Sequence, residues 1–246
     1  MGERPRYFRQ GPRPIVTNSP PPRGRGTPRE GLSDVTDERV LLDAGVTSVV
    51  GMDEVGRGCI AGPVGVGAVW CGLEALCAGG FPAGLRDSKK LSPWPRSLAA
   101  GSVRSTWEHA VVAYASPEEI DAMGISAALS LAGRRALAQL PATDLVMLDG
   151  KFNWLGTDPG LLGGDVSHVE VPPVRMYVGG DDQRIPIAAA SLIAKVDRDA
   201  VMSSLDREHP GYGWANNVGY PSPAHKQAIA ELGITPWHRK SFRLGK

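Results

Sequence analysis

Short apolar runs, the first of them rich in β-branched residues, alternate with longer segments of helical character along most of the chain. The runs predict buried strands at residues 46–52, 62–70, 110–115 and 145–149. Helices are predicted at residues 125–140, where apolar residues recur at helical spacing, and at residues 187–205, which are rich in small residues. This alternation is typical of an α/β domain.

Shorter signals complete the predicted order of elements. Ser116, Pro117 and Glu119 form a capping box that starts a further helix. Residues 169–174 predict a strand that its two prolines keep at the edge of the sheet. Residues 34–42 predict a short helix that leads into the domain.

Acidic residues stand at the carboxyl ends of two of these strands. Asp53 and Glu54 directly follow the first strand, and Asp149 ends the strand at 145–149. Because ligands collect at the carboxyl ends of strands in an α/β sheet, these acids are candidates for one site. Neighbouring strand residues point to opposite faces. Asp53 and Glu54 therefore join the same site only if the chain turns there or the site wraps around the strand end.

The segment after the first strand allows a close approach to the backbone. Gly56 and Gly58 flank Arg57, and glycines at this spacing let the main chain come near a bulky, charged group. Small residues and a cation beside two acids indicate a metal ion and a phosphate held together.

Composition narrows the function classes. The chain has 246 residues and a formal net charge of +1, so any nucleic-acid site must come from the local placement of charge. The cysteines are Cys59, Cys71 and Cys77; their odd number and their spacing favour neither a disulfide framework nor a zinc site. No apolar run reaches membrane-spanning length and no secretory signal is evident. We therefore expect a soluble cytoplasmic protein without a membrane partner.

Residues 1–45 differ from the rest, because arginines are spread there among prolines and glycines. Such a composition cannot build a core and predicts a disordered basic arm. A tail without a defined role is favoured over an arm that attracts nucleic acid electrostatically.

The segment 51–63 resembles the signature of the type 2 ribonucleases H, bacterial ribonuclease HII in particular. The matching residues are Gly51, Asp53, Glu54, Gly56, Arg57, Gly58, Ala61, Gly62 and Pro63. Further matching blocks are Asp87–Ser92, Asp149–Gly150, Gly180–Asp181 with the Ala-Ala-Ser and Arg198-Asp199 elements after it, Gly219–Pro221 and His238–Phe242. The resemblance covers roughly residues 46–243.

The resemblance implies a ribonuclease H-like mixed sheet flanked by helices over residues 46–205. A C-terminal helical extension that contacts substrate would follow, over residues 206–246. The implied catalytic and metal-binding acids are Asp53, Glu54, Asp149 and Asp181. Oxygen ligands suit Mg²⁺ or Mn²⁺, and two ions would balance four carboxylates. Asp182 is the neighbour that is most easily confused with Asp181. Arg198 and Asp199 are interpreted as a structural pair or a solvated face.

The same resemblance assigns the substrate-binding residues. Gly56, Arg57 and Gly58 would recognise the ribose 2′-hydroxyl, largely through their backbone, and Tyr220 would pack beside it. Ser88, Lys89 and Lys90 suit phosphate oxygens. The chain departs from the family at Asn217-Val218, where many relatives have His-Lys, and so loses a positive charge there.

The implied function is hydrolysis of RNA in RNA/DNA hybrids and nicking on the 5′ side of a single ribonucleotide in duplex DNA, by a monomer. One alternative is a ribonuclease HIII-like enzyme. That family usually has a folded N-terminal domain, for which this N-terminus is too short and proline-rich, and commonly another residue in place of Arg57. The other alternative is a non-cleaving RNA/DNA duplex-binding protein, against which the four acids argue.

Overall fold

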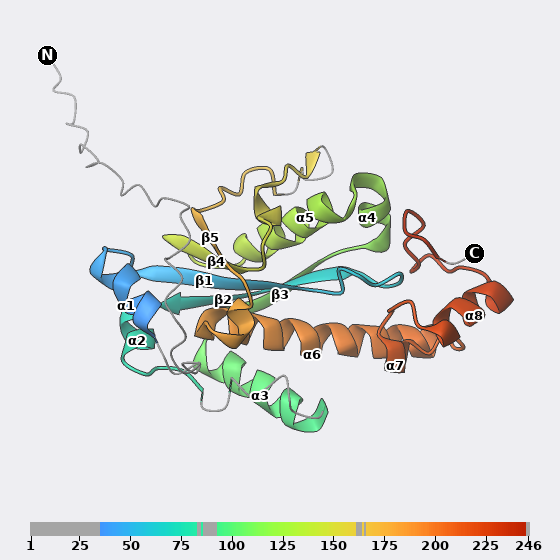
Figure 1. The fold of residues 1–246 in the computed structure, drawn as a ribbon, viewed down its shortest axis with the longest axis horizontal. Helices are drawn as coiled ribbons and strands as arrows, with labels where there is room; N and C mark the ends of the chain where they lie inside the picture. Colours follow the sequence, from blue (N-terminus) through green and yellow to red (C-terminus); the bar gives the residue numbers. More distant parts are fainter. Residues whose placement is uncertain (1–34, 83–84, 86–92, 161–163, 165, 245–246) are drawn as a thin grey trace, which may run out of the picture.

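A five-stranded sheet forms the centre of the protein, in the order β3-β2-β1-β4-β5 (Figure 1). The computed structural model describes residues 35–82, 85, 93–160, 164 and 166–244. The strands are β1 (Ser48–Val55), β2 (Val64–Gly72), β3 (Ala110–Ala115), β4 (Leu145–Asp149) and β5 (Val174–Tyr177). β1 and β3 run antiparallel to β2, whereas β4 runs parallel to β1 and β5 parallel to β4, so the sheet is mixed as expected.

Helices cover both faces of this sheet (Figure 1). They are α1 (Thr36–Asp43), α2 (Leu73–Cys77), α3 (Pro93–Thr106), α4 (Pro117–Met123), α5 (Ile125–Leu137), α6 (Ile185–Glu208), α7 (Trp214–Asn217) and α8 (Pro223–Leu232). The α5 face buries Val50 and Met52, and the α6 face buries Val49, because strand residues alternate between faces. Helix α3 lies outside α6, on the side away from the sheet (Figure 1).

Helix α6 approaches the sheet closely because glycines face it. A Cβ atom at Gly51 of β1 would lie 2.1 Å from the carbonyl carbon of Pro186, and one at Gly67 of β2 would lie 2.2 Å from the carbonyl oxygen of Ala190. Small residues of α6, among them Ala189 and Ala190, are fully buried against the sheet. This packing fixes where the segment just before α6 lies relative to β1.

The structure confirms most of the predicted elements and corrects two. The strand at 110–115 and the capping box at Ser116 are present as predicted. The first strand does not end at Met52, since its antiparallel pairing with β2 continues to Val55. The predicted strand at 169–174 is wrong, and the edge strand begins only at Val174, after the two prolines that cannot donate to a ladder.

The predicted short helix before the domain is present as α1 and packs on the sheet. Leu41 joins the hydrophobic core, and the Asp37 carboxylate accepts a 2.8 Å hydrogen bond from Tyr177 Oη. The packed part of the chain therefore begins before residue 46, where the sequence predicted the arm to end. Residues 1–34 lie outside the described residues.

The C-terminal extension is built on a buried aromatic and histidine cluster. His225 and His238 are both fully buried, beside Trp214 and Tyr212. Trp214 Nε1 donates to His225 Nε2 (2.9 Å), so His225 Nδ1 carries the proton that it donates to the carbonyl of Tyr220 (2.9 Å). The cluster therefore fixes the turn that carries Tyr220.

This cluster predicts a loss of stability in mild acid. His238 Nδ1 accepts from the backbone N–H of Thr235 (2.9 Å), so a proton on Nδ1 would point at that N–H and break the hydrogen bond. Burial, helped by the neighbouring His225, lowers the pKa of His238 from 6.5 to about 4. The unfolded chain takes up the proton first, so stability is full above pH 6.5 and falls as the pH drops towards 4, by about 3 kcal/mol. Denaturant unfolding at a series of pH values measures this loss.

A matched pair of variants separates this effect from general acid unfolding. His238→Asn keeps an acceptor near the Nδ1 position and does not titrate, so the fall in stability between pH 6.5 and 4 should be smaller. His168→Asn, at an exposed position, should keep the wild-type slope. Equal slopes in all three proteins would refute the assignment to His238.

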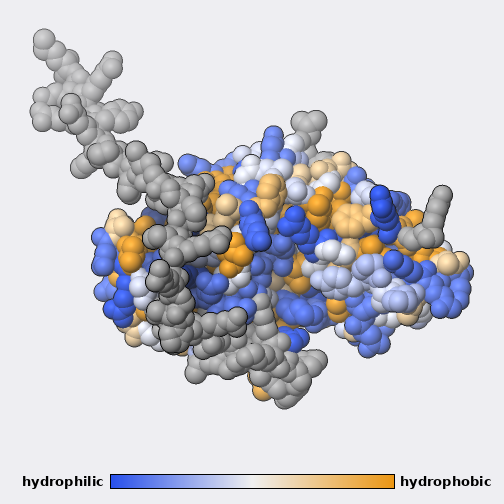
Figure 2. All heavy atoms as spheres, in the orientation of Figure 1, coloured by the Kyte–Doolittle hydropathy of each residue, from blue (hydrophilic) through white to orange (hydrophobic). Residues whose placement is uncertain are grey.

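Surface character agrees with a globular protein. On the face seen in Figure 2, hydrophobic residues reach the surface as small areas among hydrophilic ones, outside the part covered by grey atoms. In the described part of the chain, none of the helices has both the length and the apolar character that crossing a membrane requires.

Candidate metal centre

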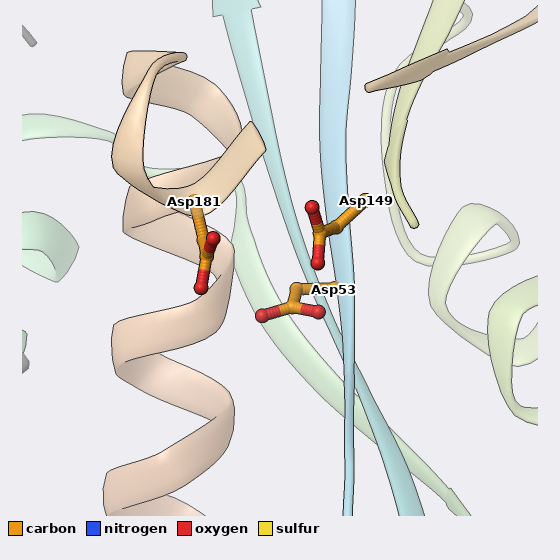
Figure 3. Close-up of side chains that lie close together, drawn as sticks. All are labelled: Asp53, Asp149 and Asp181. Carbon is orange, nitrogen blue, oxygen red and sulfur yellow. The ribbon is translucent and has the colours of Figure 1, made fainter. Parts of the chain in front are cut away.

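Three aspartates from separate parts of the chain converge at one edge of the sheet. Asp53 lies on β1, Asp149 ends β4, and Asp181 lies in the short 3₁₀ turn Gly180–Asp182 before α6. One carboxylate oxygen from each lies within 4.8 Å of the others. Figure 3 shows the three side chains pointing toward one another between the strands and the start of α6.

Strand register explains the first pair. In the parallel β1/β4 ladder Met52 pairs with Leu148, so the next residues along both strands, Asp53 and Asp149, are neighbours. Gly51, two residues before Asp53, faces α6, and the alternation of a strand places Asp53 on that same face. Asp149 stands at the carboxyl end of its strand, as predicted.

A hydrogen bond brings in the third aspartate. Asp149 Oδ1 accepts from the backbone N–H of Gly180 at 2.7 Å, which ties the 3₁₀ turn to the end of β4. A Cβ at Gly180 would lie 2.6 Å from Ile187 Cδ1 and 2.9 Å from Tyr177 Cβ, so glycine lets the turn pack closely against α6 and β5. Asp181 follows directly and reaches the other two carboxylates.

The donor set fits a hard divalent cation. Three carboxylates this close repel one another when ionised, and a bound cation removes that repulsion. All three ligand atoms are oxygens, which suit Mg²⁺ or Mn²⁺ rather than a soft metal that prefers thiolate ligands. Asp53 is buried and the other two are half-buried, so the centre is open on one side.

Glu54 does not join this group of three carboxylates. It points to the α5 face, where Trp154 Nε1 donates to its Oε2 (3.2 Å) and Arg57 Nη1 to its Oε1 (3.3 Å). The chain does not turn between Asp53 and Glu54, because β1 continues to Val55. The sequence allowed a site shared by Asp53 and Glu54 if the chain turned there or if the site wrapped around the strand end. Because the chain does not turn, a shared site would have to wrap around the strand.

The predicted glycine-rich segment and Tyr220 lie together. A Cβ at Gly58 would be 3.8 Å from the ring of Tyr220, which is half exposed. Arg57 is exposed, and Gly56 adopts a left-handed φ of +79° that favours glycine. The structure therefore brings Arg57, Gly58 and Tyr220 together at the surface beyond the end of β1, with Gly56 buried beneath them. The predicted phosphate-binding residues Ser88, Lys89 and Lys90 lie outside the described residues.

The departure from the family pattern at Asn217-Val218 has a structural role of its own. Asn217 Oδ1 accepts from the N–H of Gly219 (2.9 Å), and Asn217 Nδ2 donates to the carbonyl of Tyr212 (2.7 Å). These bonds close the turn just before Tyr220.

Two contacts of this region were missed by the sequence reasoning. Arg198 does not pair with Asp199, which binds Lys195 instead. Arg198 is buried and binds main-chain carbonyls near the glycine-rich segment. Trp154 was not identified as a partner of Glu54. The helical pattern around Arg198 does not indicate that its side chain binds main-chain carbonyls. Trp154 and Glu54 lie 100 residues apart, so no local pattern indicates their hydrogen bond.

The adjacent acids Asp181 and Asp182 allow a sharp test of the site. Only Asp181 belongs to the group of three carboxylates. Asp181→Asn should therefore remove divalent-metal binding and metal-dependent activity, whereas Asp182→Asn, with the same change of charge one residue away, should keep both within about twofold. Isothermal titration with Mn²⁺ measures the binding. The reverse pattern would move the ligand to Asp182.

Known proteins resemble this chain along most of its length. Residues 50–245 match the family model described as Ribonuclease HII. The chain is 43% identical to Ribonuclease HII of Streptomyces avermitilis over 216 residues, 87% of this chain and 85% of the relative. It is 46% identical to Ribonuclease HII of Paracoccus denitrificans over 210 residues, 85% of this chain and 91% of the relative.

A solved structure has the same fold as this chain. The ribonuclease H2 from Pyrococcus horikoshii OT3 superposes with a TM-score of 0.64 at 24% identity, covering 80% of this chain and 94% of that one. The likeness confirms the expected class, a mixed sheet flanked by helices.

Proposed function

Because this chain belongs to the ribonuclease HII family, we propose that it is a metal-dependent endoribonuclease that cleaves RNA in RNA/DNA hybrids and nicks 5′ of single ribonucleotides in duplex DNA. The observation that carries the proposal is the convergence of the Asp53, Asp149 and Asp181 carboxylates. Three further expectations belong to it: two bound ions, a monomeric state and a cytoplasmic location.

Asp53, Asp149 and Asp181 would hold the cations, with Glu54 as a fourth ligand from the other side of β1. Bound Mg²⁺ or Mn²⁺ supplies an activated water and stabilises the leaving oxygen of a phosphodiester. Trp154 and Arg57 each donate one hydrogen bond to the Glu54 carboxylate, one to each oxygen, which leaves lone pairs on both oxygens for a cation. Asp149 also orients the turn that carries Asp181 through its bond to Gly180.

The surface formed by Arg57, Gly58 and Tyr220, with the backbone of Gly56 beneath it, would hold the ribose next to the scissile bond. Backbone N–H groups can donate to a 2′-hydroxyl oxygen, which deoxyribose lacks. An exposed tyrosine ring can stack on a sugar or base. Ser88, Lys89 and Lys90 would bind phosphate oxygens of the duplex.

The direct test uses a duplex DNA with one ribonucleotide in one strand. With Mg²⁺ or Mn²⁺ the protein should cut that strand on the 5′ side of the ribonucleotide, leaving 3′-hydroxyl and 5′-phosphate ends. The same duplex without the ribonucleotide is the control and should stay intact. No cutting with either metal, but retained binding, would favour a non-cleaving duplex-binding protein.

A further inference from the structure

Two buried arginines from distant parts of the chain meet the segment that follows β1. Arg198 lies on α6 and Arg239 in the C-terminal segment, and their exposed fractions are 1% and 0%. Burying a guanidinium is costly unless its N–H groups find acceptors. Both side chains find them in main-chain carbonyls rather than in a carboxylate ion pair.

Arg239 binds the glycine-rich segment at three carbonyls. Its Nη2 donates to Gly56 O (2.8 Å), its Nη1 to Arg57 O (3.1 Å) and its Nε to Gly62 O (3.0 Å). Burial lowers the pKa of Arg239 to about 10, so the group stays charged at neutral pH. Charge-assisted hydrogen bonds are about twice as strong as neutral ones, so these three hold the segment firmly.

Because the peptide unit is planar, the hydrogen bonds of Arg239 also fix the direction of the neighbouring N–H groups. In a trans peptide the N–H points opposite to the C=O of the same unit. Fixing the carbonyls of Gly56 and Arg57 toward Arg239 therefore turns the N–H groups of Arg57 and Gly58 away from it. Within the described part of the chain, neither N–H donates to a backbone carbonyl, so both remain available as donors.

Arg198 supports the same segment from α6. Its Nη2 donates to Ala61 O (3.2 Å) and its Nη1 to Val218 O (2.8 Å). Val218 has a φ of +44°, which a β-branched residue adopts only when its surroundings enforce it. A Cβ at Gly56 would lie 2.1 Å from Arg198 Nε, so the glycine is needed for this packing.

The C-terminal segment that carries Arg239 is itself anchored. The Asp121 carboxylate accepts from the N–H groups of Lys240 (2.9 Å) and Ser241 (2.8 Å). The N–H of Arg239 donates to Ile60 O (2.9 Å), which places the last residues beside the connection between β1 and β2. Figure 1 shows this segment, in red, next to that connection.

We propose that Arg239 is a positioning residue for ribose recognition: it aims the N–H groups of Arg57 and Gly58 at the 2′-hydroxyl and so sets the preference for ribonucleotide over deoxyribonucleotide. The inference rests on the proposed function. Lysine cannot replace arginine here, since a point charge on a flexible stem does not fork to three carbonyls.

The test compares Arg239→Lys with the wild-type full chain by binding to two duplexes of one sequence, with and without a single ribonucleotide. Ca²⁺ replaces Mg²⁺, and a gel verifies that the duplex stays intact. Loss of the aligned donors should reduce the ribonucleotide preference about tenfold, with the affinity for the all-DNA duplex unchanged. A purely structural role would lower thermal stability but leave the ratio of the two affinities as it was.

Arg135→Lys is the matched control. Arg135 is a half-buried arginine that binds Glu119 (2.8 Å) and the carbonyl of Tyr114 (3.0 Å), away from the glycine-rich segment. It should lose stability and keep the wild-type ratio. If Arg239→Lys does not fold, Asp121→Ala is the second variant, because it removes the anchor of the C-terminal segment from a surface position. A lowered ratio of the two duplex affinities supports the inference, and an unchanged ratio overturns it.

The outcomes separate this inference from the proposed function. A wild-type chain that neither nicks nor prefers the ribonucleotide duplex refutes the proposed function. A wild-type chain that nicks and prefers it, together with a folded Arg239→Lys that keeps the same ratio, refutes the positioning role alone.

Discussion

Replacing Asp149 by asparagine should abolish metal-dependent cleavage, by about a thousandfold or more, without weakening the fold. Asparagine removes the charge that a divalent cation needs but keeps an oxygen that can accept from the N–H of Gly180. It also relieves the repulsion among three carboxylates within 4.8 Å of one another. The metal-free variant should therefore melt at the same temperature as the parent or above it, whereas added Mn²⁺ should no longer raise that temperature.

Asp144 provides the control, because it stands directly before the same strand that Asp149 ends. Its Oδ2 accepts from the N–H (2.8 Å) and the hydroxyl (2.7 Å) of Thr47, and these bonds hold the pKa of Asp144 below its usual range. Asp144→Asn should lower stability and keep cleavage. An Asp149→Asn protein that retains the parent's activity would remove this residue from the metal centre.

Replacing Gly51 by alanine should lower the free energy of unfolding by about 3 kcal/mol. The new Cβ would meet the main chain of Pro186 at 2.1 Å, so α6 itself must move and no side chain can yield in its place. The 3₁₀ turn with Asp181 directly precedes α6 and would shift with it. The folded fraction of the variant should therefore also cleave more slowly and bind Mn²⁺ more weakly than the parent.

Gly101→Ala tests whether the loss belongs to this close approach. Gly101 lies in α3, and a Cβ there meets nothing within 4 Å. Alanine should raise the free energy of unfolding by up to about 1 kcal/mol, because glycine is a poor helix former, and leave cleavage unchanged. If Gly51→Ala is as stable as the parent in denaturant unfolding, the described packing of α6 on β1 is wrong.

The sheet and its helices could be predicted because local patterns specify them. Apolar runs marked four strands, and the capping box at Ser116 is visible in the sequence itself. The end of β1 was misplaced because its last residues are held by pairing with β2, a contact that no local pattern records. The edge strand was shifted because residues before Val174 have strand-like composition but prolines that break the ladder.

The candidate site was predictable in part, for a different reason. Asp53 and Asp149 directly follow the apolar runs that predicted two strands, where an acid is conspicuous, but Asp181 was identified only through the family resemblance. Its convergence depends on the Gly180 bond and on the position of α6, neither of which the sequence reveals. The sequence predicted that Asp53 and Glu54, as neighbours in a strand, point to opposite faces unless the chain turns. The structure places the two side chains on opposite faces.

The account depends most on the claim that the three aspartates form a cation site. Crystals of the protein grown with Mn²⁺ test it directly, because anomalous scattering locates the metal independently of activity. Manganese should appear between the carboxylates of Asp53, Asp149 and Asp181. Ordered carboxylates with no manganese between them, at a concentration of the metal that supports cleavage, would contradict the account.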